Sequence, residues 1–263
     1  MTALVSDSLL LARRNLEHVR QIPEKLLDVT LQPLMFVLLF AYVFGGVIHI
    51  PDGDYKSYLI GGILVQTIAF GMMGPGVSIA TDLREGIVDR FRSLPMARSA
   101  YLIGHVTAEF LASLVAIVIL SLSGLIVGWR VSSDLPHAIA GYALLCLLAV
   151  AMIWLGTLVG VLARTPDAVQ GVAFITVFPL TFLANTFVPA DGLPDGLKQV
   201  AMWNPVSAFA AAVRQLFGNP TAVPTDAAWP LQHPVIASVC WCLAIIAVAV
   251  PLTLRGYARR VSD

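Results

Sequence analysis

Long apolar stretches alternate with short polar segments along most of this chain. A helix needs about 20 mostly apolar residues to cross the hydrocarbon core of a bilayer. Six stretches meet that requirement, and they cover residues 31–48, 57–80, 101–128, 137–163, 168–188 and 232–254. The pattern therefore predicts an all-α integral membrane protein, with six transmembrane helices in one domain that covers residues 1–263.

Several of the predicted helices carry small or helix-breaking residues. Four of them interrupt the second helix: Gly71, Gly74, Pro75 and Gly76. The fifth helix contains Pro179, and in the fourth Gly156 and Gly160 have the spacing that allows another helix to approach closely. Breakers are tolerated inside a membrane where neighbouring helices, hydroxyl side chains or water satisfy the freed backbone groups. We therefore expect close helix contacts at these positions, either within the chain or across a dimer.

Two further segments have the pattern of amphipathic helices. Residues 6–25 place apolar and charged residues on opposite sides, which favours a helix on the cytoplasmic membrane interface over a solvated extension. In the outer segment 189–231, Asn204 and Pro205 are typical of a helix start. Four apolar residues then fall on one face: Val206, Phe209, Val213 and Leu216. This pattern predicts a helix that lies on the outer leaflet or dips into it.

Charge is scarce and balanced, with 16 basic and 16 acidic residues, which together make up 12% of the chain. A soluble globular domain has about 25% charged residues, and a nucleic-acid-binding domain has a basic excess. The strongly positive mean hydropathy points the same way. Composition therefore excludes a soluble domain, a disordered chain and a nucleic-acid partner, and it favours residence in a lipid bilayer.

The distribution of basic residues predicts the orientation. With the N-terminus inside, the inner segments hold Arg13, Arg14, Arg20, Lys25, Arg84, Arg90, Arg92, Arg98, Arg164, Arg255, Arg259 and Arg260. The outer segments hold only Lys56, Arg130, Lys198 and Arg214. Because cytoplasmic loops carry the excess of Lys and Arg, both termini are predicted to lie in the cytoplasm. The first positive charges follow a short leucine run, which is the wrong order for a cleaved signal peptide.

The chain lacks the motifs of catalysis and of nucleotide or metal binding. A phosphate-binding loop needs a lysine after glycine, and none of the three lysines (Lys25, Lys56, Lys198) follows one. The sequence contains no HExxH, GxSxG or CxxC motif, and its five histidines are scattered. We therefore expect no catalytic residue, no metal site and no cofactor in this chain.

Glu109 is the one residue with a full charge that the pattern places inside the bilayer, four residues after His105. An intramembrane carboxylate can belong to a proton relay. It can equally meet water or pair with a basic residue, because Glu109 lies about two turns from the cytoplasmic end of its helix. We favour a structural or coupling role, since proton-driven transporters use chains of ionisable groups.

Some polarizable and aromatic side chains in the second and fifth helices suit a lipophilic ligand. These candidates for a substrate pathway are Gln66, Phe70, Met72, Met73, Phe174, Phe178 and Phe182. The alternative for each is ordinary helix packing or lipid contact. The inner loop 82–98 is the other candidate site, because its charges alternate with apolar residues, as in a short helix that docks on a partner. A helix at the interface with no partner is the alternative.

Three segments of the chain resemble a known family, the ABC-2 type permeases of the daunorubicin/doxorubicin-resistance kind. They are QPLMFVLLFAYVFGG at residues 32–46, DLREGIVDRFRSLPMARS at residues 82–99, and NTFVP at residues 185–189 continuing through WNPV at 203–206 to Arg214. The second segment is the most specific. Together with six spans in this order, the resemblance covers nearly the whole chain.

The resemblance implies the membrane subunit of an ATP-binding-cassette exporter, in which two permeases pair with two ATPase subunits that bind ATP and Mg. The second permease is a further copy of this chain or a paralogue. The family's coupling helix, which contacts the ATPase, falls on Arg84, Glu85, Asp89, Arg90, Phe91, Arg92 and Pro95. Residues 6–25 resemble the family's connecting helix, and residues 189–231 resemble its re-entrant pair. The cargo of such an exporter is a hydrophobic small molecule or lipid, moved out by alternating access.

Three alternatives to this function remain open at the level of sequence. The first is export of an envelope lipid or polysaccharide by the same kind of transporter. The second is a carrier or channel that needs no ATPase, which predicts several deep ionisable residues or an internal repeat. The third is a membrane scaffold with no transport path.

Overall fold

The computed structural model describes residues 34–86, apart from 46, 47, 49, 51 and 52, and residues 100–260. In these residues the chain is helical, with no strand beyond one isolated bridge. The predicted interfacial helix 6–25 lies outside the described residues. So do Asp89, Arg90, Phe91, Arg92 and Pro95 of the predicted coupling loop.

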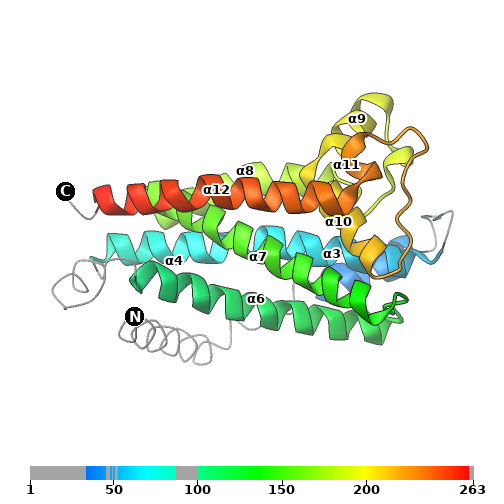
Figure 1. The fold of residues 1–263 in the computed structure, drawn as a ribbon, viewed down its shortest axis with the longest axis horizontal. Helices are drawn as coiled ribbons and strands as arrows, with labels where there is room; N and C mark the ends of the chain where they lie inside the picture. The colour runs from blue at the N-terminus through cyan, green and yellow to red at the C-terminus, as the bar shows by residue number, and fades with distance from the viewer. Residues whose placement is uncertain (1–33, 46–47, 49, 51–52, 87–99, 261–263) are drawn as a thin grey trace.

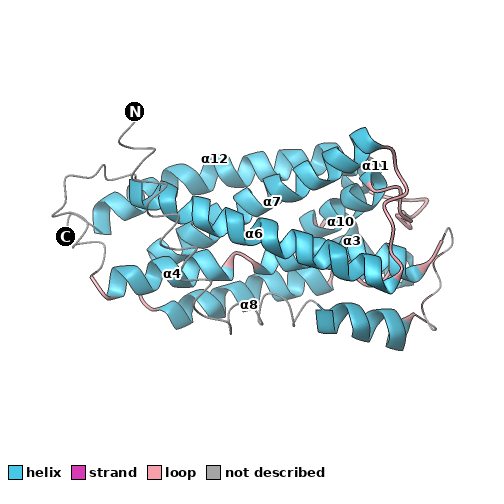
Figure 2. Ribbon diagram, turned by 90° about the horizontal axis from the view of Figure 1, so that it is seen from below, coloured by secondary structure: helices cyan, strands magenta, loops and turns pink. Residues whose placement is uncertain are grey.

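Four helical stretches of the described chain are long and apolar enough to cross a membrane. They are Tyr55–Arg84, which comprises α3 (Tyr55–Phe70) and α4 (Met73–Arg84), then α6 (Ala100–Val127), α7 (Leu135–Leu162) and α12 (Pro234–Arg260). The first and fifth predicted spans are shorter helices. The described part of the first, from Leu34 onward, continues into η1 (Phe40–Phe44), and the fifth is α8 (Pro166–Phe182). The long helices lie side by side in one bundle (Figures 1 and 2).

The helix ends differ from the predicted ones most at α8 and α12. Helix α8 ends at Phe182 rather than Val188, because the carbonyls of residues 185–187 accept hydrogen bonds from side chains of other helices instead of continuing its own ladder. Helix α12 runs six residues past the predicted end at Leu254 and finishes at Arg260. Basic residues in its last turn, Arg259 and Arg260, suit the negative end of the helix dipole.

The break between α3 and α4 falls at Gly71 and Met72, and α7 packs against it. A Cβ atom at Gly156 of α7 would lie 2.0 Å from the Met72 carbonyl oxygen, and one at Gly160 would lie 2.2 Å from the Gly76 carbonyl oxygen. Only glycine allows this approach of α7 to the backbone of α4. The paired glycines therefore serve packing within the chain, which the sequence left open.

Three shorter helices gather at one end of the bundle, which we call the α9–α11 end (Figure 1). They are α9 (Asp195–Trp203), α10 (Pro205–Leu216) and α11 (Trp229–Gln232), after the single turn η2 (Ala190–Gly192). The predicted start of α10 is confirmed, since the Asn204 side chain accepts a hydrogen bond from the Val206 amide. However, α10 is buried on almost every side against α3, α7 and α12, so it does not lie on the surface of the protein.

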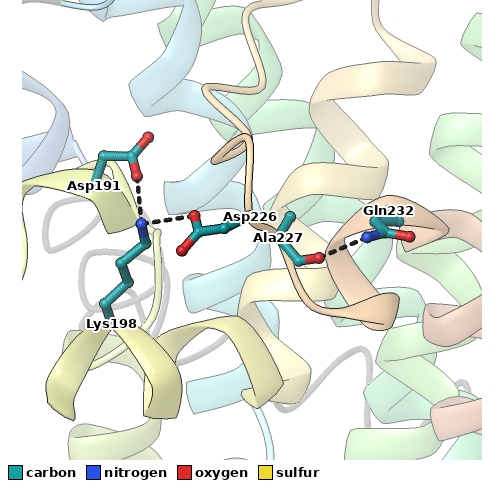
Figure 3. A network of polar contacts seen from close by, with 5 residues as sticks. All are labelled: Asp191, Lys198, Asp226, Ala227 and Gln232. Atoms are coloured by element: carbon teal, nitrogen blue, oxygen red, sulfur yellow. Dashed lines mark hydrogen bonds and ion pairs between the residues drawn. The ribbon is translucent and has the colours of Figure 1, made fainter. Parts of the chain in front are cut away.

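An ion-pair network ties the surface of this end together (Figure 3). The Lys198 ammonium lies 2.7 Å from Asp226 and 2.9 Å from Asp191. Its hydrogen bonds, first with Asp226 and then with Asp191, raise the pKa of Lys198, and the bond from Lys198 lowers the pKa of Asp226. Both shifts favour the charged forms, so the network is intact at neutral pH and joins α9 to the loop before α11.

Candidate functional site

The structure brings four of the seven predicted pathway residues together. The rings of Phe70 and Phe174 meet edge to face, with centroids 6.1 Å apart. Along α8, Phe174 and Phe178 are 6.4 Å apart, and Phe178 stacks on Phe182 at 4.3 Å. Residues four apart lie on the same face of a helix, which is why these three rings form one row.

The row continues through three phenylalanines that sequence reasoning missed. Phe182 packs on Phe187 at 5.3 Å, Phe187 stacks on Phe40 at 4.3 Å, and Phe36 lies within 6.2 Å of both. We call the seven rings the aromatic track: Phe70, Phe174, Phe178, Phe182, Phe187, Phe40 and Phe36. It runs from the α3–α4 break to the segment after α8. No local pattern marks its second half, since Phe187 follows the helix and meets Phe40 only in the fold.

The α8 part of the aromatic track is open to the surface of the chain. Phe174, Phe178 and Phe182 are 53%, 44% and 40% exposed, whereas Phe187 is 5% exposed. Aromatic rings that are held in a row offer flat, polarizable faces on which an aromatic or lipophilic molecule can stack. The track is thus an apolar surface that is open along α8, buried at Phe187 and partly covered at Phe40 and Phe36.

The other three predicted residues lie inside the bundle beside this surface. Met72 is 2% exposed, because the break at Gly71 turns it toward α7 and α8, where it packs with Ala173 and Val177. Met73 is partly buried in the same cluster, and Gln66 is buried within α3. Met72 and Met73 belong to the same apolar cluster as Phe70, and the exposed face of the track does not include Met72 or Gln66.

The second half of the site is Arg214, a residue that charge counting assigns to an outer loop. In the structure Arg214 is fully buried. Its guanidinium donates to the carbonyls of Tyr58 (2.7 Å), Asn185 (3.0 Å) and Thr186 (2.8 Å), and it lies 3.5 Å from the centre of the Tyr58 ring. A buried charge needs such partners because its transfer from water is costly. The fold therefore removes the charged Arg214 side chain from water, whereas Glu109 is only partly buried.

Arg214 and two tyrosines hold the segment between α8 and η2. The Tyr58 hydroxyl donates to the Asn185 carbonyl (2.5 Å), and the Tyr55 hydroxyl donates to the Phe187 carbonyl (3.1 Å). Gly62 completes the contact, since a Cβ atom there would lie 2.2 Å from the Thr186 carbonyl oxygen. Three consecutive carbonyls thus face α3, and the segment places the buried ring of Phe187 between Phe182 and Phe40 in the aromatic track.

Glu109 lies at the opposite half of the bundle, partly buried and beside the first turn of α4. Its carboxylate would be 3.4 Å from a Cβ atom at Gly74. One turn earlier, His105 is buried and its Nε2 lies 3.2 Å from the Pro75 carbonyl oxygen. Glu109 thus belongs to the contact of α6 with α4, and its role stays a prediction.

The described part of the predicted coupling site is the end of α4. Arg84 is its last residue, and Glu85 follows as its cap; both are exposed. Within the described residues, no cluster of His, Cys, Asp or Glu could hold a metal ion.

A family model and several known proteins match this chain over most of its length. Residues 8–217 match the ABC-2 type transporter family. The daunorubicin resistance ABC transporter permease protein DrrB1 of Streptomyces coeruleorubidus is 30% identical over 256 residues, which cover 97% of this chain and 87% of that protein. The doxorubicin resistance ABC transporter permease protein DrrB of Mycobacterium tuberculosis is 24% identical over 87% of this chain and 81% of its own length.

A second permease of the same organism is also similar. The probable doxorubicin resistance ABC transporter permease protein DrrC is 26% identical over 86% of this chain and 79% of its own length. The similarity of all three extends over most of both chains, and the apolar helices show a multi-pass membrane protein. The chain therefore belongs to the ABC-2 type transporter family and is homologous to the daunorubicin and doxorubicin resistance permeases.

Proposed function

We propose that this chain is the membrane subunit of an ATP-driven exporter that moves a hydrophobic or amphipathic compound out of the cytoplasm or the inner leaflet. The observation that carries the proposal is the aromatic track, whose exposed rings on α8 are Phe174, Phe178 and Phe182. Its relatives are named for resistance to daunorubicin and doxorubicin, which supports a drug-like cargo. The phenyl rings suit a planar aromatic compound better than an envelope polysaccharide, whose surface is polar.

In this proposal the ATPase is a separate subunit that binds ATP and Mg, and a second permease completes the transporter. That permease is another copy of this chain or a paralogue. Both termini lie in the cytoplasm, so the α9–α11 end faces outward and the end of α4 faces the ATPase. Family membership supports this assembly over a carrier or channel without an ATPase.

The segment 82–98 is proposed as the mechanical link to the ATPase. Arg84 and Glu85 are exposed where α4 ends, so they are free to contact another chain. Asp89, Arg90, Phe91, Arg92 and Pro95 follow them in the sequence. Charged residues on a contact surface give it orientation and specificity.

Removing two rings of the aromatic track should reduce transport strongly. We expect F174A/F178A to lower the ATP-dependent uptake of doxorubicin into inside-out vesicles about tenfold, since an aromatic pair contributes about 0.5–1.5 kcal/mol beyond the area it buries. The vesicles contain the chain with its ATPase subunit. The matched control is L122A/I126A, which truncates two exposed apolar side chains on α6 away from the track. Equal uptake by both double variants would refute the role of the track, and uptake without the ATPase would refute the proposed function.

A charge reversal in the coupling segment should uncouple the ATPase instead. We expect R90E to abolish the stimulation of ATP hydrolysis by doxorubicin, because a contact that carries the wrong charge costs several kcal/mol. R164E reverses an exposed charge in the short loop between α7 and α8, on the same side of the bundle, and should leave the stimulation intact. The readout is phosphate release by the reconstituted complex. If both variants keep full stimulation, the segment is not the link.

A further inference from the structure

Two buried polar side chains in the segment after α8 have no hydrogen-bond partner among the residues that the structure describes. They are Asn185, whose side-chain oxygen and nitrogen are both unpaired, and Thr186, whose hydroxyl is unpaired. Both residues are 0% exposed. Leaving such a group buried and unpaired costs about 1–3 kcal/mol, which the fold could avoid with apolar residues of similar shape. Buried groups of this kind call for an explanation in function or bound solvent.

Other buried asparagines at the α9–α11 end are fully paired. Asn204 donates to the Leu180 carbonyl (2.7 Å) and accepts from the Val206 amide (2.9 Å). Asn219 accepts from the Trp129 indole (2.7 Å) and donates to the Arg130 carbonyl (2.9 Å). These two side chains hold the local structure together. The side-chain amide of Asn185 does not, because the hydrogen bonds that hold Asn185 use its backbone groups.

The hydrogen bonds that hold Asn185 and Thr186 in place use their backbone groups. The Arg214 guanidinium donates to both backbone carbonyls, and the Ser207 hydroxyl accepts from the backbone N–H of Asn185 (3.0 Å). Neither anchor involves the amide or hydroxyl of the side chain. The segment would therefore keep the same anchors with leucine and valine at these positions.

Their position relates them to the aromatic track. In the sequence, Asn185 and Thr186 lie between Phe182 and Phe187, two consecutive rings of the track whose centroids are 5.3 Å apart. A molecule that stacks on the rings at this end would bring its polar substituents toward the same segment. The amide offers two donors and an acceptor, and the hydroxyl offers a donor and an acceptor, so both recognise neutral polar groups. The Arg214 charge, 3.0 Å from the Asn185 carbonyl oxygen, disfavours a cationic group there.

Resting on the proposed function, we propose that Asn185 and Thr186 form a polar recognition point for hydroxyl and carbonyl groups of a cargo whose aromatic body stacks on the track. Both side chains are covered in the present conformation. The contact therefore forms in a state of the transport cycle that uncovers these side chains. When they are covered again, the polar groups of the cargo lose their partners, which favours release.

The test compares doxorubicin, which carries hydroxyl and carbonyl groups, with ethidium, a planar aromatic cation that has neither. ATP-driven uptake of each probe is measured in inside-out vesicles that contain the chain and its ATPase subunit. We expect the wild type to prefer doxorubicin. In N185L/T186V the KM for doxorubicin should rise about tenfold with little change in the maximal rate, and uptake of ethidium should persist. The ratio of doxorubicin uptake to ethidium uptake should therefore fall in the double variant.

Each other outcome has a distinct meaning. A wild type without preference, or a double variant that keeps the wild-type preference, overturns the recognition point. Thermal unfolding of the purified double variant distinguishes a role in recognition from a role in the fold. If the side chains serve recognition, replacing their unpaired groups should leave the variant as stable as the wild type or more stable. A destabilised variant that loses both probes alike would show that these side chains serve the fold, and the inference fails. A wild type that transports neither probe contradicts the proposed function itself.

Discussion

Replacing Arg214 with methionine should destabilise the protein more than any other single substitution of a charged residue in the described chain. The change removes the donors of three buried carbonyls, those of Tyr58, Asn185 and Thr186. A carbonyl left buried without a donor costs about 1–3 kcal/mol, and breaking a buried charged network costs about 3–5 kcal/mol. We expect R214M to lose most of its folded fraction in detergent, measured by thermal unfolding with size-exclusion detection.

Two further variants separate the charge from its geometry. R214K keeps the positive charge but replaces the planar fork by a single ammonium that cannot reach three carbonyls in the same directions, so we expect intermediate stability. R130M is the matched control, because Arg130 also donates to two backbone carbonyls, those of Leu125 and Trp129, at the same end of the bundle. Arg130 is exposed, and water replaces its bonds. If R214M unfolded at the temperature of R130M, the anchoring role of Arg214 would be wrong.

The contrast between these two arginines shows where sequence reasoning reached its limit. Both arginines count as outer charges, and an arginine at the end of an amphipathic helix normally faces water. The burial of Arg214 depends on carbonyls about 30 and more than 150 residues away, at Asn185 and Tyr58. It also depends on Gly61 and Gly62, whose missing side chains leave room for the guanidinium. The sequence around Arg214 alone could not predict this burial, because the groups that enclose the side chain come from distant segments.

Features that follow from periodic residue spacing could be predicted from the sequence, whereas features that depend on contacts between distant segments could not. The positions of the apolar helices, the start of α10 at Pro205 and the row of phenylalanines on α8 follow from residue spacing within one helix. The end of α8 at Phe182 and the meeting of Phe187 with Phe40 require donors and rings from other helices. The all-helical class is confirmed, but the prediction of six full-length spans is not: the described residues contain four helical stretches of sufficient length and two shorter apolar helices.

The break between α3 and α4 illustrates the same division. The run from Gly71 to Gly76 predicted an interruption, because glycine and proline weaken a helix. The sequence did not show which helix would fill the gap. In the structure Gly156 and Gly160 of α7 pack directly on the backbone of Met72 and Gly76, so two glycine-rich segments far apart in sequence form one contact. This contact joins the middle of the bundle to α4, whose far end precedes the proposed coupling segment.

Placing an alanine at Gly156 should therefore be far more damaging than its single methyl group suggests. The new Cβ would lie 2.0 Å from the Met72 carbonyl oxygen and 2.9 Å from its carbonyl carbon. Backbone cannot move aside as a flexible side chain does, so α7 must separate from α4. Overpacking of this kind costs about 1–3 kcal/mol or more. We expect G156A to lower the unfolding temperature and, since α4 shifts, to reduce the stimulation of ATP hydrolysis by doxorubicin.

The matched control for this change is G171A in α8. A Cβ atom at Gly171 meets nothing within 4 Å, and Gly171 also lies inside a helix. Alanine is about 1 kcal/mol better than glycine in a helix interior, so G171A should be as stable as the wild type or more so. The two variants add the same methyl group and gain the same helix propensity, and they differ only in what that methyl group meets. A G156A protein as stable as G171A would mean that α7 does not pack on the α3–α4 break at the distance described.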